Sequence, residues 1–199
     1  MSMLQKINSF WKENPILRKL AKNFGYLFSS NMISAGLSML QGIFSARLLG
    51  VAGFGTLGTI TIFVTVINKI TSFRMGELVI KYVGEFNENN DQPRAAAVFK
   101  AAALAELIAS LIAFGLIWLV APLGALYFAK DASLAPWFVV YGGIILANLI
   151  AESSTGLLQL FDRFRRMAGL NVLQSVVTLA LIILAWWQNT GLLGVVVAY

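Results

Sequence analysis

Residues Phe24–Ala46, FGYLFSSNMISAGLSMLQGIFSA, contain no charged side chain. An uncharged, mostly apolar run of roughly 18 residues or more is long enough to cross the hydrocarbon core of a bilayer as a helix. A cleaved signal peptide is not indicated, because the apolar run and the basic segment before it are too long and no small-residue cleavage site follows. The run therefore predicts a transmembrane helix.

Four further apolar runs follow and are separated by short polar segments. Continuous runs of this length favour helices, because the strands of a membrane barrel alternate over about ten residues. Each run carries at most one charged residue, namely Lys69 in the second, Glu106 in the third and Glu152 in the fourth. The four runs are 54–73, 101–128, 137–160 and 167–187.

Glycine and polar residues mark the connections between these runs. Gly50, Gly53 and Gly55 predict a turn between the first two runs, and Asn87–Pro93 is a loop by composition. The chain continues after a turn at 188–191 with only eight apolar residues, 192–199. We expect these to open a sixth span, so that the chain is the N-terminal part of a longer membrane protein or a truncated reading frame. The alternative is a short re-entrant or interfacial tail.

The predicted fold class is therefore all-α, a polytopic transmembrane bundle of five complete spans and the start of a sixth. Residues 1–23 are polar and basic, and they predict a cytoplasmic amphipathic segment before a bundle that covers 24–199. Pro15 is expected to open a helical turn within that segment.

Composition excludes several classes of protein. The chain has 199 residues, of which 58% are hydrophobic and only 12% charged, about half the charge of an average soluble domain. It has no cysteine and no histidine, which removes the usual zinc ligands, disulfides and Cys or His nucleophile–base pairs. The sequence offers no catalytic constellation, and we expect no enzyme activity, metal or cofactor. The net charge of +6 is more typical of membrane orientation than of nucleic-acid binding.

The basic residues predict the orientation. Twelve of the 15 Lys and Arg residues lie in 1–23, 74–100 and 161–166, which fall on one side of the membrane. Only Arg47 and Lys130 fall on the other side. Because cytoplasmic loops carry the excess of Lys and Arg, the N-terminus is expected in the cytoplasm.

Three segments together resemble a known family. They are ARLLGVAGFG at 46–55, SFRMGELVIKYVGEF at 72–86 and LLQLFDRFRRMAGLNVLQ at 157–174. Their order and spacing resemble the N-terminal half of the polysaccharide biosynthesis (O-antigen type) flippases, in the superfamily of the multidrug/toxin extrusion transporters. The resemblance covers nearly the whole chain. One departure is Val51–Ala52, where the family often has a proline followed by an acidic residue.

The resemblance implies a transporter that flips polyprenyl-pyrophosphate-linked oligosaccharide across the bacterial cytoplasmic (inner) membrane by alternating access. Its expected partners are the lipid-linked oligosaccharide, membrane lipids and a C-terminal bundle of the same protein; nucleic acid is not expected. Three alternatives stay open at this stage: a multidrug exporter of the same superfamily, a membrane enzyme such as a polymerase, and a non-transporting small membrane protein.

Cationic residues of the second run are candidates for the substrate cavity. Lys69 lies about 21 Å along a helix that begins near Gly55, at about 1.5 Å per residue, and is therefore within the membrane. Arg74, Glu77 and Lys81 are spaced by three and four residues and share one face. This track suits a pyrophosphate headgroup that enters from the cytoplasm. The alternative is that Arg74 and Lys81 extend to the interface.

Other polar residues in the membrane have more than one possible role. Asn31, Gln41 and Asn68 either bond across helices or line the cavity. Glu152 couples transport to a cation or proton, pairs with Lys69, or extends to the interface and is solvated. Glu106 is expected near the cytoplasmic start of its helix, in an interfacial or intrahelical role.

Overall fold

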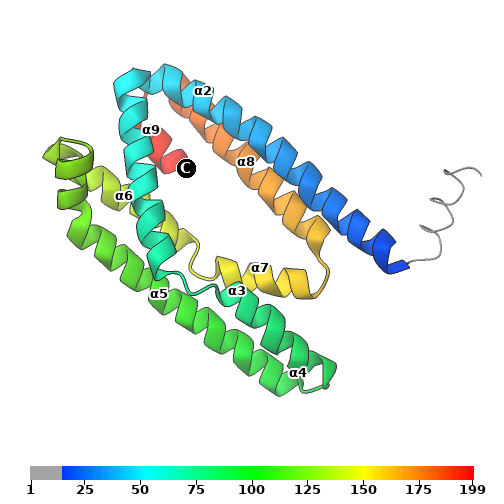
Figure 1. Cartoon of the computed structure of the whole chain (residues 1–199). Helices are drawn as coiled ribbons and strands as arrows, with labels where there is room; N and C mark the ends of the chain where they lie inside the picture. Colours follow the sequence, from blue (N-terminus) through cyan, green and yellow to red (C-terminus); the bar gives the residue numbers. More distant parts are fainter. Residues whose placement is uncertain (1–14) are drawn as a thin grey trace, which may run out of the picture.

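The computed structural model describes residues 15–199, and every regular element in that range is helical (Figure 1). This confirms the all-α bundle. The elements are α2 Pro15–Thr71, α3 Met75–Leu78, the π-helix η1 Val79–Val83, α4 Gly84–Glu88, α5 Gln92–Phe128, the 3-10 helix η2 Ala132–Leu134, α6 Ala135–Ala147, α7 Ala151–Leu160, α8 Phe164–Trp187 and α9 Gly191–Ala198.

Gly50 divides α2 into a first half, 15–49, and a second half, 51–71. Its backbone has φ 67° and ψ 179°, a combination that is essentially restricted to glycine. The chain changes direction sharply there (Figure 1). The predicted turn is therefore in the expected place, but a single residue makes it, and Gly53 and Gly55 lie within the second half of α2.

Four segments are long and apolar enough to cross a membrane: Leu17–Glu88, Gln92–Phe128, Ala132–Leu160 and Phe164–Trp187. Because Gly50 divides the first segment, the four contain the five expected spans. Large apolar side chains cover the outside; Trp187 is 81% exposed and Ile70 77% exposed. An apolar exterior of this extent is stable in lipid rather than in water.

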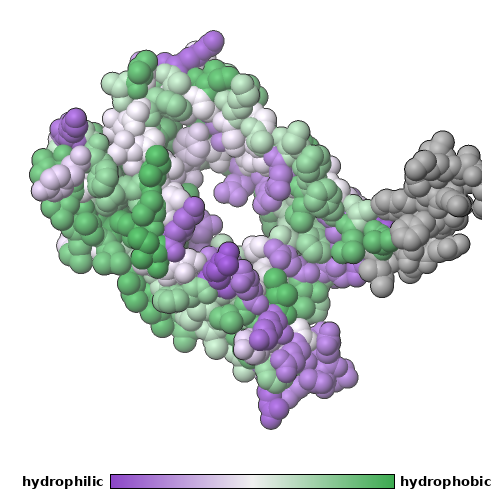
Figure 2. Space-filling model, in the orientation of Figure 1, coloured by the Kyte–Doolittle hydropathy of each residue, from purple (hydrophilic) through white to green (hydrophobic). Residues whose placement is uncertain are grey.

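The helices form two arms around a hollow. The first half of α2 runs beside α8 in one arm, and the second half of α2 packs with α5 and α6 in the other (Figure 1). Figure 2 shows hydrophilic residues along the inner edge of the hollow and mainly hydrophobic residues on the outside. In the second arm, the Phe63 and Phe138 rings meet edge-to-face at 5.1 Å.

The polar segment that follows the second span is also helical. Elements α3, η1 and α4 run antiparallel to the start of α5. The non-helical connection between them is only Asn89–Asp91, shorter than the predicted loop Asn87–Pro93. The Asp91 side chain accepts a hydrogen bond from the backbone N–H of Arg94 at 3.2 Å and caps α5. Val79 and Val83 are buried against α5 in this hairpin.

The expected amphipathic segment at 1–23 lies partly outside the described residues. Within them, 15–23 belong to α2, and Pro15 is its first residue, where a missing N–H is tolerated. Lys19 forms an exposed ion pair with Asp162 in the turn between α7 and α8, and the Asn23 amide donates to the same carboxylate at 3.4 Å. These contacts join the start of α2 to the end of α7.

Candidate functional site

Two helix interruptions lie side by side in the bundle. Residues 72–74 separate α2 from α3, and residues 148–150 separate α6 from α7. The fourth apolar run, 137–160, falls within one candidate span as expected, but this span consists of two helices, α6 and α7. Irregular backbone at membrane depth is tolerated only where protein surrounds it or where it lines a cavity.

Glu106 of α5 caps the N-terminus of α7. Its Oε1 accepts from the backbone N–H of Glu152 at 2.7 Å. Its Oε2 accepts from the backbone N–H of Ser153 at 2.9 Å and from the Ser153 hydroxyl at 2.6 Å. The first N–H groups of a helix have no partner within the helix, and a carboxylate there is favourable. Glu106 is buried, and it replaces the acceptors that the break in the fourth span removes.

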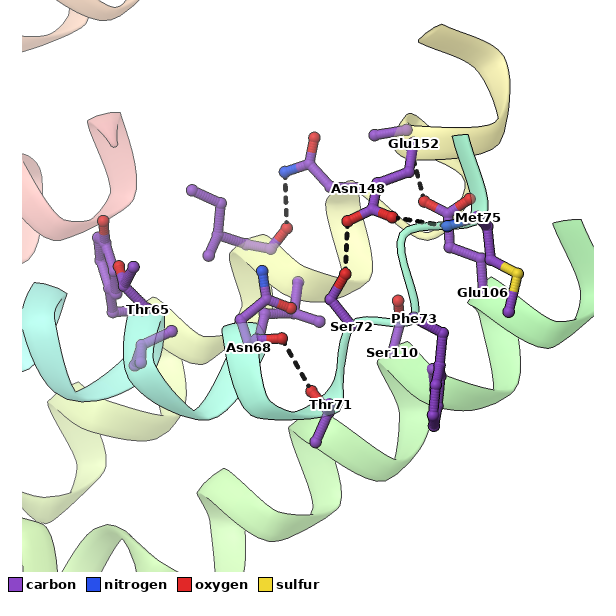
Figure 3. Close-up of a pocket in the computed structure, with 16 residues that line it drawn as sticks. Thr65, Asn68, Thr71, Ser72, Phe73, Met75, Glu106, Ser110, Asn148 and Glu152 are labelled. Carbon is purple, nitrogen blue, oxygen red and sulfur yellow. Dashed lines mark hydrogen bonds between the residues drawn. The ribbon is translucent and has the colours of Figure 1, made fainter. Parts of the chain in front are cut away.

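Glu152, at the start of α7, makes the reciprocal contact with the other interruption. Its Oε1 accepts from the Ser72 hydroxyl at 2.6 Å, and its Oε2 accepts from the backbone N–H of Met75 at 3.1 Å (Figure 3). The Glu152 side chain therefore caps α3, while its own backbone is capped by Glu106. The two carboxylates link α5, α7 and α3 in one chain of hydrogen bonds.

Two glycines allow α3 and α7 to approach closely enough for these contacts. A Cβ atom on Gly156 would lie 2.5 Å from the backbone oxygen of Gly76, and a Cβ atom on Gly76 would lie 2.8 Å from the backbone oxygen of Glu152. Real Cβ atoms do not come this close. The backbones of α3 and α7 are therefore in direct contact, as small residues permit in membrane helices.

A cavity of about 260 Å³ adjoins both interruptions (Figure 3). Asn68, Ser72 and Glu152 line it together with Asn148, whose amide donates to the backbone oxygen of Ile144 at 2.9 Å. Glu106 closes another part of its wall. The cavity is therefore polar where the helices are broken, and Asn68 and Glu152, both candidates from the sequence, line it together.

Arg74 and Glu77 line a second, more open cavity on the other side of Glu152. The Arg74 Nη1 and Glu77 Oε1 atoms are 3.3 Å apart, and both side chains are largely exposed, so the pair contributes little stability. Arg74 has φ 51° and ψ 46°, a left-handed conformation that costs an ordinary residue about 1 kcal/mol or more. The surrounding structure therefore holds the Arg74 backbone in an unfavourable conformation beside the second cavity.

The remaining two candidates lie elsewhere. Lys69 is exposed on the second half of α2 and lines neither of these two cavities. Within residues 15–199 it forms no ion pair with Glu152, because the Glu152 carboxylate is occupied by Ser72 and Met75. Asn31 lines a third cavity, of about 370 Å³, between the first half of α2 and α8.

Sequence reasoning missed the capping role of Glu106 and its partner Ser153. Glu106 was expected near the cytoplasmic interface, yet it is buried against α7. Each of the two intramembrane acids has a serine nearby in the sequence, and a buried carboxylate needs hydrogen-bond donors. This combination could have indicated the role of Glu106.

The first two cavities are lined by charged as well as neutral polar groups. Arg74 is the one cation among their described lining residues, beside Glu77, Glu106 and Glu152, and both intramembrane carboxylates are engaged by donors from the chain. The described residues contain no group of three or more Asp, Glu, His or Cys that could hold a metal ion.

Comparisons with known proteins agree with this architecture. A search of curated proteins and a search of solved structures each found no significant match. The family described as polysaccharide biosynthesis protein matches residues 20–199, which is nearly the whole chain and includes both helix interruptions. The chain therefore belongs to the polysaccharide biosynthesis protein family.

Proposed function

We propose that this chain is part of a flippase that moves polyprenyl-pyrophosphate-linked oligosaccharide across the bacterial cytoplasmic membrane. The observation that carries the proposal is the polar hollow between two arms whose outer surfaces are apolar (Figure 2). The hollow shields a hydrophilic headgroup from lipid, while the prenyl tail stays in the bilayer. Family membership supports this role over that of an enzyme.

One cation is available for the pyrophosphate end of such a substrate: Arg74, which lines the second cavity beside Glu77 and Glu152. A guanidinium binds phosphate oxygens in a bidentate way, and Arg74 is held at the cavity mouth with an exposed side chain. Lys69, three residues before the first interruption, is exposed and lines neither the first nor the second cavity; in this proposal it is a second cation that the headgroup meets outside them. In this proposal a second helix bundle of the same protein closes the hollow, and the two bundles alternate in their access to each side.

A multidrug or cation exporter is less well supported. Such a transporter would use free carboxylates deep in its cavity, whereas Glu106 and Glu152 each accept at least two hydrogen bonds from the chain. In the proposed mechanism these two acids hold the broken helices in place. Any coupling of transport to a proton through Glu152 would have to break its contacts with Ser72 and Met75.

The proposed orientation places the N-terminus and the Arg74 cavity on the cytoplasmic side. The basic residues before the first span and in the α4–α5 and α7–α8 regions support it. A cysteine at Asn90 should be protected from an impermeant thiol reagent in intact cells, and a cysteine at Ser133 should be labelled. Labelling of the Asn90 variant from outside contradicts the orientation.

The test of function uses alanine variants of Lys69 and Arg74 in the complete protein. Each should cause lipid-linked oligosaccharide to accumulate in the cytoplasmic leaflet, measured per amount of protein in the membrane. Lys69→Arg should retain more transport than Lys69→Ala, and Arg74→Lys should be impaired because the fork geometry is lost. Lys100→Ala, which removes an exposed cation on α5, is the matched control. Normal transport by both alanine variants would contradict the assigned sites.

A further inference from the structure

The third cavity is a groove with a different chemistry from the other two. It lies between the first half of α2 and α8, and none of its lining residues is Lys, Arg, Asp or Glu. On α2, Asn31, Ser34, Ser38 and Gln41 recur every three or four residues and form one stripe. The matching stripe on α8 is Asn171, Gln174, Ser175 and Thr178.

Part of this polar surface joins the two helices. The Gln41 amide donates to the backbone oxygen of Ser175 at 2.8 Å, and the Ser34 hydroxyl donates to the backbone oxygen of Asn171 at 3.4 Å. Gln41 therefore has the helix-bonding role that was one of its two expected roles. These bonds fix the spacing of the stripes.

The other side chains of the stripes have spare hydrogen-bonding capacity. Among the described residues, the side chains of Asn31, Ser38, Asn171, Gln174 and Thr178 form no hydrogen bond with the chain. Unpaired polar groups at membrane depth are costly, so the groove is filled by water or by a polar ligand. Amides and hydroxyls both donate and accept, which matches the hydroxyl groups of a sugar.

The groove is continuous with the cavity at the helix interruptions. Tyr141 and Ile144 of α6 line both. Tyr141 presents an aromatic face together with a hydroxyl, a combination suited to a ligand with both apolar and polar surfaces. The residues that line the groove are uncharged, whereas those that line the adjoining cavity include Glu106 and Glu152, and Glu152 also lines the cavity that holds Arg74.

We infer that the groove between α2 and α8 is the binding site for the uncharged glycan portion of the transported lipid. The inference rests on the proposed function and divides the ligand in two: the pyrophosphate lies toward Arg74, and the sugar hydroxyls bond to Asn31, Asn171 and Gln174. The pyrophosphate is assigned to the Arg74 side because the groove has no cation among its described lining residues and a hydrogen bond from a guanidinium is stronger than one from a neutral group.

Two probes separate the two ends of the ligand. The first is polyprenyl-pyrophosphate-linked oligosaccharide purified from the host, and the second is the same carrier without sugar. Binding of each to the purified complete protein is measured by native mass spectrometry. Asn31→Leu and Gln174→Leu should each weaken binding of the sugar-bearing lipid by about tenfold, and leave binding of the sugar-free lipid unchanged. Arg74→Ala should weaken binding of both.

Matched controls keep the test specific. Gln188→Leu removes an amide from the end of α8 outside the groove, and Ser29→Ala removes an exposed hydroxyl of α2 that does not line it; neither should change binding. Unchanged binding of the sugar-free lipid shows that the groove variants are folded. If the groove variants weaken binding of both lipids equally, or of neither, the groove is not the glycan site although the proposed function stands. If the wild-type protein binds neither lipid, the proposed function fails and the inference fails with it.

Discussion

Replacing Glu106 with alanine should destabilise the bundle more than the same replacement of any exposed acidic residue. The change removes the acceptor of two backbone N–H groups, those of Glu152 and Ser153, and of the Ser153 hydroxyl. A buried donor left without a partner costs about 1–3 kcal/mol, so the two backbone groups together cost about 2–6 kcal/mol. Glu106 also lines the neighbouring cavity, and water entering there restores some of these bonds. The lower half of that range is therefore expected.

Glu106→Gln should have an intermediate effect. Glutamine keeps one acceptor oxygen, but its NH₂ group faces a backbone N–H whichever way the amide is placed. One donor is then left unpaired, at a cost of about 1–3 kcal/mol. The order of stability should be wild type, then Glu106→Gln, then Glu106→Ala.

Thermal unfolding of the purified protein in detergent, followed by tryptophan fluorescence, measures this order. For a chain of this size about 1 kcal/mol corresponds to a change of about 2–4 °C in Tm, so a loss of about 2–4 kcal/mol in Glu106→Ala should lower Tm by roughly 4–16 °C. Ser110→Ala is the control, because Ser110 lies one turn further along α5, lines the same cavity and forms no side-chain hydrogen bond within the described residues. A Tm for Glu106→Ala that equals the control value would refute the capping role.

Three further predictions concern the backbone and one surface carboxylate. Gly156→Ala places a methyl group 2.5 Å from a backbone oxygen of α3 and should strongly reduce the yield of folded protein in size-exclusion chromatography, whereas Gly169→Ala, with open space around it, should not. Gly50→Ala should lower stability by about 1–3 kcal/mol in the same unfolding assay, because φ 67° with ψ 179° is strained for alanine; an unchanged Tm would contradict this. A hydrogen bond from the Ser133 hydroxyl, and a second from the Ser133 N–H, lower the pKa of Asp131. The contribution of the Asp131 carboxylate to stability is therefore present above its ordinary pKa and is lost as the pH falls through the lowered pKa. Ser133→Ala should raise the pKa of Asp131 in an NMR titration, and an unchanged pKa would show that the hydroxyl is not the cause.

Much of the fold could be predicted from the sequence because membrane helices need long apolar runs with few or no charges, and the chain has five, each with at most one charged residue. The break at 148–150 could not, because it depends on a partner 46 residues away along the chain. A helix in lipid stays continuous unless other groups replace its lost backbone hydrogen bonds. Asn148 is the only local sign of a break, and the same residue type is also found in unbroken membrane helices.

The candidate site could be predicted from the sequence only in part. The three-residue spacing of Arg74 and Glu77 predicted that the two side chains lie close together, and they do pair and line one cavity, although Arg74 lies in the interruption before α3 and not on a shared helix face. Whether Glu152 bonds to Lys69 or to another group depends on how α3 and α7 cross. That crossing is set by direct backbone contact at Gly76 and Gly156, and composition alone does not reveal which glycines meet.

The capping of α7 by Glu106 also bears on how the protein is made. Glu106 lies in the third span and is synthesised before the fourth span, whose break it stabilises. The acceptor that the break at 148–150 requires is therefore already present in the chain when the fourth span is made.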